Sequence, residues 1–183
     1  VLFRSDDLGD TFSRPVIAKL NDGNWYAVLG NGYNSVNGLA KLYLINLATG
    51  GVIRVSTGSG SASTPNGLSS PSLLDTDGNG TVDVAYAGDI DGNMWKFDLS
   101  STTSSSWAED YSRPLHPGVS TQPILTAPEI SIHPIKGYLV YFGTGRLLVA
   151  DDLTDTSVQA LYGIWDSGAT PPTSGSQALF AQT

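Results

Sequence analysis

SRPVIAKL, at residues 13–20, recurs twice along the chain, as SSPSLLDT at 69–76 and TAPEISIH at 126–133. Each copy begins with a small polar residue, has a proline two positions later and continues as an apolar run. The prolines fall at positions 15, 71 and 128, so the steps are 56 and 57 residues. A fixed period of this length indicates one structural unit repeated three times.

Each unit continues with two more strand-like segments. The first set is apolar and ends at a glycine, namely Gly30, Gly88 or Gly143, and comprises WYAVLGNGYN (25–34), VDVAYAGDIDG (82–92) and GYLVYFGTGR (137–146). The second set places an aromatic residue shortly before an Asn or Asp and comprises LYLINLATG (42–50), MWKFDLS (94–100) and LYGIWDSG (161–168). A weaker fourth strand is GVIRVS at 51–56. Repeated groups of antiparallel strands with this period predict β-propeller blades.

The expected fold is therefore all-β, a quinoprotein-like β-propeller of which residues 6–183 form about three blades. The blade limits are predicted near 10–60, 66–115 and 120–183. Three blades do not close a ring, since propellers have roughly four to eight blades. We therefore expect a piece of a longer, incomplete propeller, most simply a seven-bladed one. Residues 1–5, VLFRS, are interpreted as a non-native leader, because one reading frame of a common sequencing adapter encodes Leu-Phe-Arg-Ser.

Composition agrees with a strand-rich, acidic protein. The 183 residues include 21 glycines and 10 prolines, and the formal net charge is −8. This charge argues against nucleic acid and anionic membrane as partners, because both recruit basic surfaces. No apolar run approaches the roughly 18 residues of a membrane-spanning helix. The absence of cysteine fits a bacterial extracellular protein without excluding the cytosol.

A candidate calcium loop is DTDGNGTVD at 75–83. Calcium takes six to eight oxygen ligands, and oxygen-bearing residues two positions apart in a tight turn can all face one ion. The predicted ligands are the side chains of Asp75, Asp77, Asn79 and Asp83 with the backbone carbonyl of Thr81. The alternative is an ordinary hairpin turn with solvated acids.

The loop differs from an EF-hand in two respects. Its twelfth position is Tyr86 where an EF-hand has a bidentate glutamate, and its flanks have the pattern of strands. Asp83 would then have to complete the coordination shell directly. A second acidic turn, GDIDGN at 88–93, contains Asp89 and Asp91 and is interpreted as a blade turn in preference to a second ion site.

No catalytic motif was found. His116 and His133 both precede a proline and have no nucleophile or carboxylate pattern beside them. The chain has no Gly-x-Ser-x-Gly sequence and no phosphate-binding loop. Five aromatic residues are expected to pack between blades and not to form a ligand platform: Trp25, Tyr43, Trp95, Tyr162 and Trp165.

Taken together, GDTFSRPVIAKL, WYAVLGNGYNS, LLDTDGNGTVDVAYAGDIDGNMWKFDLS and YLVYFGTGR resemble the C-terminal propeller of the PilC/PilY family of type IV pilus tip-associated adhesins. The resemblance covers nearly the whole chain and is most specific where the calcium loop runs into AGD-x-x-GN-x-W-x-FDL. It implies one Ca²⁺ held by the five loop residues and exposure at the cell surface, on the pilus tip or outer membrane. It also implies a role in pilus biogenesis, extension against retraction, twitching motility and adhesion. The implied partners are pilus subunits such as minor pilins and a host or abiotic surface.

Two other interpretations stay open from the sequence. A pyrroloquinoline-quinone dehydrogenase propeller would be an enzyme, but it holds its calcium in the central channel and not in a hairpin. An integrin-like adhesive propeller uses hairpin calcium loops in most blades. Here the equivalent segments, AKLNDGNW (18–25) and SIHPIKGY (131–138), have one acid and none. We therefore expect a calcium-binding pilus protein that is not an enzyme.

Overall fold

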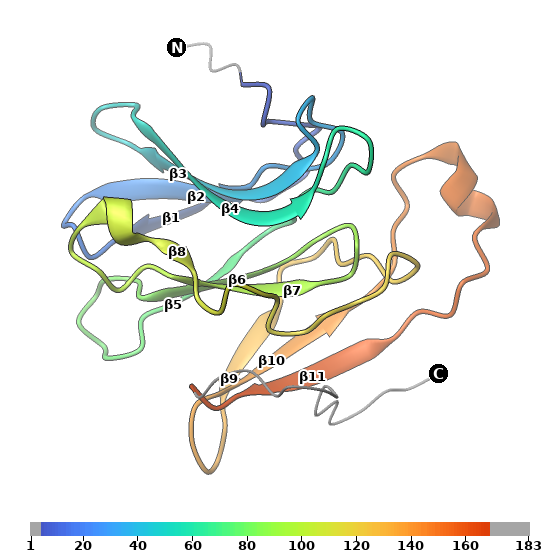
Figure 1. Ribbon diagram of the computed structural model, residues 1–183. Coiled ribbons are helices and arrows are strands. Elements are labelled where there is room, and N and C mark those ends of the chain that lie inside the picture. The colour runs from blue at the N-terminus through green and yellow to red at the C-terminus, as the bar shows by residue number, and fades with distance from the viewer. Residues whose placement is uncertain (1–4, 169–183) are drawn as a thin grey trace.

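The computed structural model describes residues 5–168, which form three antiparallel β-sheets stacked one on another (Figure 1). Each sheet comes from one contiguous segment of chain, so the stack follows the order of the sequence. Residues 1–4 of the predicted leader and 169–183 of the predicted third blade lie outside the described residues. The all-β architecture predicted from the repeats is confirmed, whereas the blade limits and the seven-bladed ring stay predictions.

The first sheet has the order β1-β2-β3-β4 and the second the order β5-β6-β7-β8. The third contains three strands within the described residues, in the order β11-β10-β9. The strands of the first sheet are β1 (Val16–Lys19), β2 (Trp25–Gly30), β3 (Leu39–Asn46) and β4 (Val52–Gly60). Those of the second are β5 (Ser72–Leu74), β6 (Val84–Gly88), β7 (Met94–Asp98) and β8 (Ala108–Glu109). Those of the third are β9 (Glu129–Ile132), β10 (Tyr138–Gly143) and β11 (Leu161–Asp166).

Helical structure in the described part of the chain is limited to two short 3₁₀ segments. They are η1 (Ser104–Ser106), before β8, and η2 (Ala150–Thr154), between β10 and β11. The loop that contains η2 extends away from the three sheets on the right of Figure 1.

Two apolar cores join the sheets. The first lies between the first and second sheets and includes Val28, Leu44 and Trp95. The second lies between the second and third and includes Tyr86, Phe142 and Ile164. Alternate side chains of each strand face opposite sides of its sheet, so the middle sheet contributes to both cores. Burial of these faces is what holds the stack together.

The predicted packing role is wrong for one aromatic residue. Trp25 is 54% exposed, because it lies at the start of β2 beside Lys19 and outside the core between the sheets. Tyr43 and Trp95 are buried, and Tyr162 packs against the second core. Trp165 stacks on His133, with ring centroids 4.4 Å apart.

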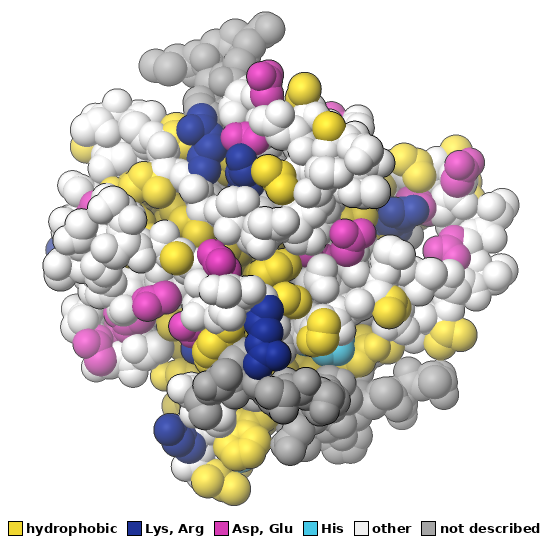
Figure 2. Space-filling view, viewed as in Figure 1, with side chains coloured by type: hydrophobic (Ala, Val, Ile, Leu, Met, Phe, Trp, Pro, Cys, Tyr) yellow, Lys and Arg dark blue, Asp and Glu magenta, His cyan; other side chains and the backbone are white. Residues whose placement is uncertain are grey.

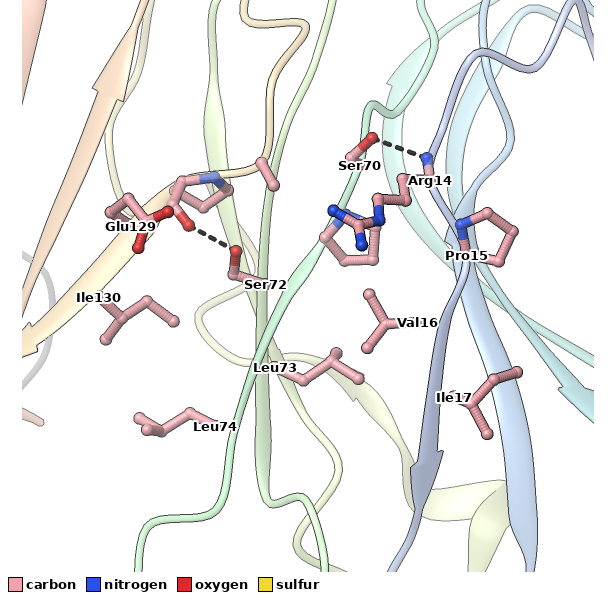
Figure 3. Close-up of a pocket in the computed structure, with 13 residues that line it drawn as sticks. Arg14, Pro15, Val16, Ile17, Ser70, Ser72, Leu73, Leu74, Glu129 and Ile130 are labelled. Carbon is pink, nitrogen blue, oxygen red and sulfur yellow. Dashed lines mark hydrogen bonds between the residues drawn. The ribbon is translucent and has the colours of Figure 1, made fainter.

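The first strands of the three sheets border one shared cavity of about 650 Å³ (Figure 3). Its lining includes the three repeat prolines and the residues that follow them in β1, β5 and β9. Arg14 donates its backbone N–H to Ser70 Oγ at 2.9 Å, and Ser72 Oγ donates to the Pro128 carbonyl. The recurring proline segments thus meet at the edge where the sheets converge, as innermost propeller strands do.

Candidate metal centre

The candidate metal loop is the hairpin connection between β5 and β6. Leu74 pairs with Val84, and the Asp83 N–H donates to the Leu74 carbonyl at 2.9 Å, so residues 75–83 protrude from the end of the pair. Gly78 and Gly80 have φ values of 77° and 88°, which glycine adopts without a steric penalty. The strand flanks confirm that this is not an EF-hand, and Tyr86 at the twelfth position is a fully buried core residue.

The fold brings the three loop carboxylates together. Each of Asp75, Asp77 and Asp83 offers an oxygen, and these oxygens lie within 4.8 Å of one another. Two oxygens that bind one Ca²⁺ at about 2.3–2.6 Å can be separated by at most about twice that distance. The observed spacing fits this limit, so the donor set suits a single hard cation. Within residues 5–168 no other three His, Asp or Glu side chains bring their ligand atoms this close together.

Asp75 is held by the backbone of its own loop. Its two carboxylate oxygens accept hydrogen bonds from the N–H groups of Gly78 and Gly80, both at 2.7 Å. The N–H of Gly80 is the main reason that the pKa of Asp75 lies below its usual value. The Asp75 carboxylate is therefore charged at neutral pH, in a loop already curved around it.

Asn79 lies between an acid and a hydroxyl. Its Nδ2 donates to Asp77 Oδ2 at 2.9 Å. Its Oδ1 accepts from the Thr81 N–H at 2.7 Å and from Thr81 Oγ1. These contacts involve the N–H and the hydroxyl of Thr81. Ligation of an ion by the Thr81 carbonyl stays a prediction.

Asp83 differs from the other two acids because it is only 7% exposed. Its Oδ2 accepts from the backbone N–H and the hydroxyl of Thr76, at 2.8 and 2.6 Å. Its Oδ1 accepts from Asn21 Nδ2 at 2.9 Å. Four lone pairs serve three hydrogen bonds, so the carboxylate keeps one lone pair for an ion.

Thr76 and Asn21, the two residues that hold Asp83, were not predicted from the sequence. Thr76 lies inside the nine-residue motif, and its hydroxyl could have been considered as a donor to a neighbouring ligand. Asn21 lies in the turn between β1 and β2, in a different sheet, and the repeat alignment indicates only that this turn neighbours the metal loop. Which side chain crosses between the two turns depends on how the sheets are stacked, and no local pattern reveals it.

The second acidic turn is built differently. Asp89 is fully buried, and its carboxylate accepts hydrogen bonds from Trp95 Nε1 at 2.7 Å, Asn66 Nδ2 at 2.8 Å and the Asn93 N–H at 2.8 Å. Burial nevertheless raises the pKa of Asp89, and burial together with the nearby Asp89 charge raises that of Asp91. The donors around Asp89 favour the interpretation of a blade turn over that of an ion site.

Charge is mixed over the face shown in Figure 2. Acidic side chains are visible at the left of the view, which is the side where the β5–β6 hairpin lies in Figure 1. Asp77 is exposed and Asp75 is half-buried, so the loop lies at the surface of the molecule and apart from the cavity of Figure 3, while Asp83 lies at its buried base.

Stacked antiparallel sheets from consecutive segments, with first strands converging on one cavity, define the chain as part of a β-propeller that has an acidic loop in one blade hairpin. Residues 4–179 match the family model described as the PilY1 beta-propeller domain. The chain belongs to this family, which confirms the resemblance found from the sequence.

Named relatives agree with this assignment. The chain is 42% identical, over 97% of its length, to a type IV pilus biogenesis factor PilY1 homolog of Xylella fastidiosa. It is 41% identical, over 93% of its length, to the type IV pilus biogenesis factor PilY1 of Pseudomonas aeruginosa strain PAO1. It matches 13% and 17% of these two proteins, so it spans less than a fifth of their length.

A solved structure shows the same architecture. The crystal structure of the Pseudomonas aeruginosa PilY1 C-terminal domain matches with a TM-score of 0.82 and 37% identity. The match covers 94% of this chain and 40% of that domain. Among the residues that the structure describes, no helix is both long and apolar enough to cross a bilayer.

Proposed function

We propose that this chain is a calcium-binding segment of the propeller of a type IV pilus biogenesis protein, and that Ca²⁺ fixes the β5–β6 loop. The observation that supports this most directly is the convergence of Asp75, Asp77 and Asp83 within the separation that one Ca²⁺ permits. The ion would be held by these carboxylates with Asn79 Oδ1 and the Thr81 carbonyl.

The bound ion would neutralise charge that the loop otherwise concentrates. Three carboxylates in one turn repel one another, and only Asp83 has cross-sheet support from a donor. Ca²⁺ is favoured over Mg²⁺ because Mg²⁺ requires near-octahedral geometry and keeps several of its waters. We expect an affinity on the order of micromolar to sub-millimolar, as in extracellular calcium modules.

The relatives, which are named as pilus biogenesis factors, support the proposed biological role. We infer that the chain acts outside the cell, on the pilus tip or outer membrane, with minor pilins and a host or abiotic surface as partners. Calcium would order one blade edge for such a partner, and its loss would release that edge. Pilus extension and retraction, twitching motility and adhesion would then depend on calcium.

A dehydrogenase-type enzyme is less well supported. The charged residues that line the cavity at the converging strands are Arg14 and Glu129, and the cluster of three acids lies in the hairpin instead. The relatives' names describe pilus biogenesis. We therefore propose a binding role without catalysis.

Calcium titration of the purified chain tests the metal site. Asp75→Ala should lower calcium affinity by at least tenfold, because it removes a charged ligand and the acceptor that curves the loop. Asp91→Ala, in the second acidic turn, is the matched control and should leave affinity and a stoichiometry of one unchanged. Equal affinity in wild type and Asp75→Ala would exclude the assignment.

The cellular role needs the full-length protein in its own bacterium. Asp75→Ala should reduce surface pili and twitching zones, while Asp91→Ala should not. Normal piliation and motility, in a strain whose Asp75→Ala protein has lost calcium binding in vitro, would contradict the proposed link between calcium and pilus function.

A further inference from the structure

Asn21 connects the metal loop to the preceding sheet. Its Nδ2 lies within hydrogen-bond distance of three acceptors in the second sheet, Asp83 Oδ1 at 2.9 Å, the Val82 carbonyl at 3.0 Å and the Leu99 carbonyl at 3.2 Å. Its Oδ1 accepts from Thr81 Oγ1 at 2.9 Å. The backbones also meet here, because the Val82 N–H donates to the Lys19 carbonyl at 3.0 Å.

The Thr81 hydroxyl lies between two acceptors that belong to different sheets. One is Asn79 Oδ1 within the metal loop, and the other is Asn21 Oδ1 in the β1–β2 turn. A threonine hydroxyl has a single proton, so it can donate fully to only one acceptor at a time. The loop and the neighbouring sheet therefore compete for this proton.

Ligation by Asn79 would decide that competition. A carbonyl oxygen has two lone pairs, and Asn79 Oδ1 accepts from both the N–H and the hydroxyl of Thr81. To take a cation, Asn79 Oδ1 must give up one of these hydrogen bonds. The N–H is fixed by the turn, whereas the hydroxyl can rotate, so the hydroxyl is the donor released.

We propose that Asn21 is a positioning residue for the calcium loop, and that the Thr81 hydroxyl couples calcium capture to docking of the first sheet on the second. With Asn79 ligating the ion, Thr81 donates to Asn21 alone. The inter-sheet hydrogen bond is thereby strengthened, and Asn21 keeps Asp83 in place through its Nδ2. This inference rests on the proposed calcium site. Coupling of this kind is reciprocal, so a firm inter-sheet contact also raises calcium affinity.

Calorimetric calcium titration of single and double variants tests the coupling. Thr81→Val keeps the backbone carbonyl but removes the hydroxyl, and it should weaken calcium binding about fivefold. Asn21→Ala also removes the donor to Asp83 and should weaken binding roughly tenfold or more. The double variant should bind like Asn21→Ala, because both changes break the same hydrogen bond. Asn24→Ala, whose side chain donates to Asp22, and Thr81→Ser, which keeps a hydroxyl, should bind like wild type.

Hydrogen exchange of the 20–24 turn separates coupling from a merely structural role. Calcium should slow exchange of this turn in the wild type and have no such effect in Thr81→Val. A structural role alone would change exchange equally with and without the ion. Thr81→Val leaves every contact of Asn21 Nδ2 intact, so it answers the question even where Asn21→Ala does not fold.

The outcomes distinguish the two proposals. If wild type and Asp75→Ala both fail to bind calcium, the metal site and the coupling are both wrong. If wild type binds calcium, Thr81→Val binds it equally well and the 20–24 turn is unaffected by the ion, the coupling is overturned while the metal site stands.

Discussion

At the scale of single residues, the three loop acids have different structural roles. Asp77 is exposed, whereas Asp83 is buried and accepts hydrogen bonds from Thr76 and from Asn21 of the neighbouring sheet. A buried carboxylate with three donors contributes to folding whether or not an ion is bound. Asp77 accepts hydrogen bonds from the N–H and the side chain of Asn79, both exposed and within the same loop, so it should contribute little to folding.

Asp83→Ala should therefore destabilise the calcium-free protein by about 1–3 kcal/mol, because it removes three part-buried hydrogen bonds from Thr76 and Asn21. Asp77→Ala should leave the calcium-free stability within about 0.5 kcal/mol of wild type. Both variants should lose calcium binding. Urea unfolding in a chelator compares them, and equal calcium-free stabilities would contradict the distinction.

His116 makes a pH-dependent contribution to the stability of the folded protein. Its ring is buried beside Phe142 and Tyr162, with centroids 5.6 and 4.8 Å away, and its Nδ1 has no hydrogen-bond partner within the described residues. Burial lowers the pKa of His116. Its neutral form therefore supports folding fully above the unfolded value of about 6.5, and this support is lost as pH falls through the folded pKa.

Stability of the wild type should thus decrease by up to about 1.4 kcal/mol per pH unit as pH falls below about 6.5. His116→Phe keeps an aromatic ring against the same neighbours and should show a flatter profile in this window. Unfolding by urea at several pH values measures both slopes. Parallel profiles would show that His116 is not the titrating group.

At the scale of elements, the repeat predicted the positions of the strands more accurately than their first and last residues. The segment at 42–50 corresponds to β3, which starts earlier, at Leu39. The weak strand predicted at 51–56 extends to Gly60 as β4, because a register shift near Leu39 and Lys41 lets the two strands stay paired. Periodicity identifies a strand, but a bulge depends on its partner. The clustering of Asp75, Asp77 and Asp83 was predictable for the same reason as the strands, since the three acids are close in sequence. Calcium binding by this loop stays a prediction.

The three repeat glycines have unequal environments. A Cβ added at Gly30 would lie 2.0 Å from the carbonyl oxygen of Ser69, in the segment that leads into the second sheet. One added at Gly143 would meet no atom of the described residues within 4 Å. Gly30→Ala should therefore lower the free energy of unfolding by about 1–3 kcal/mol, because the backbone segments on either side of the new methyl group must separate. Gly143→Ala is the matched control and should be nearly neutral. Thermal unfolding of the two variants checks this, and similar melting temperatures would disprove the close approach.

At the scale of the whole molecule, charged groups help to join the second and third sheets. Lys96 of β7 forms ion pairs with Asp110 at 2.8 Å and with Asp166 of β11 at 2.9 Å, and Tyr86 donates to Asp166 at 2.6 Å. The Asp166 side chain is 2% exposed. No sequence pattern pairs Lys96 with Asp166, because their contact depends on the packing of two complete sheets. The sequence could predict the number of stacked units but not this connection between them.

Removing one partner of this network should destabilise the molecule. Lys96→Met leaves the Asp166 carboxylate buried without its ion pair, with the Tyr86 and Tyr111 hydroxyls and the Gly168 N–H as its remaining donors. This should lower the free energy of unfolding by about 3 kcal/mol. Lys96→Met with Asp166→Asn should be more stable than Lys96→Met alone, since the asparagine still accepts from Tyr86 and has no charge to bury. Urea unfolding of the three proteins at neutral pH compares them.

The ion pair between Lys96 and Asp166 also predicts that the protein loses stability in acid. Burial opposes the charge of Asp166, but hydrogen bonds from Tyr86 and Lys96 outweigh burial and lower its pKa. The wild type should therefore keep this contribution above the unfolded aspartate value of about 3.9 and lose it as pH falls through the folded pKa. The double variant lacks the carboxylate and should lose less stability over that range. Two results would contradict this role of the charges of Lys96 and Asp166 in holding the two sheets together. One is a double variant that is no more stable than Lys96→Met, and the other is a double variant that loses as much stability in acid as the wild type.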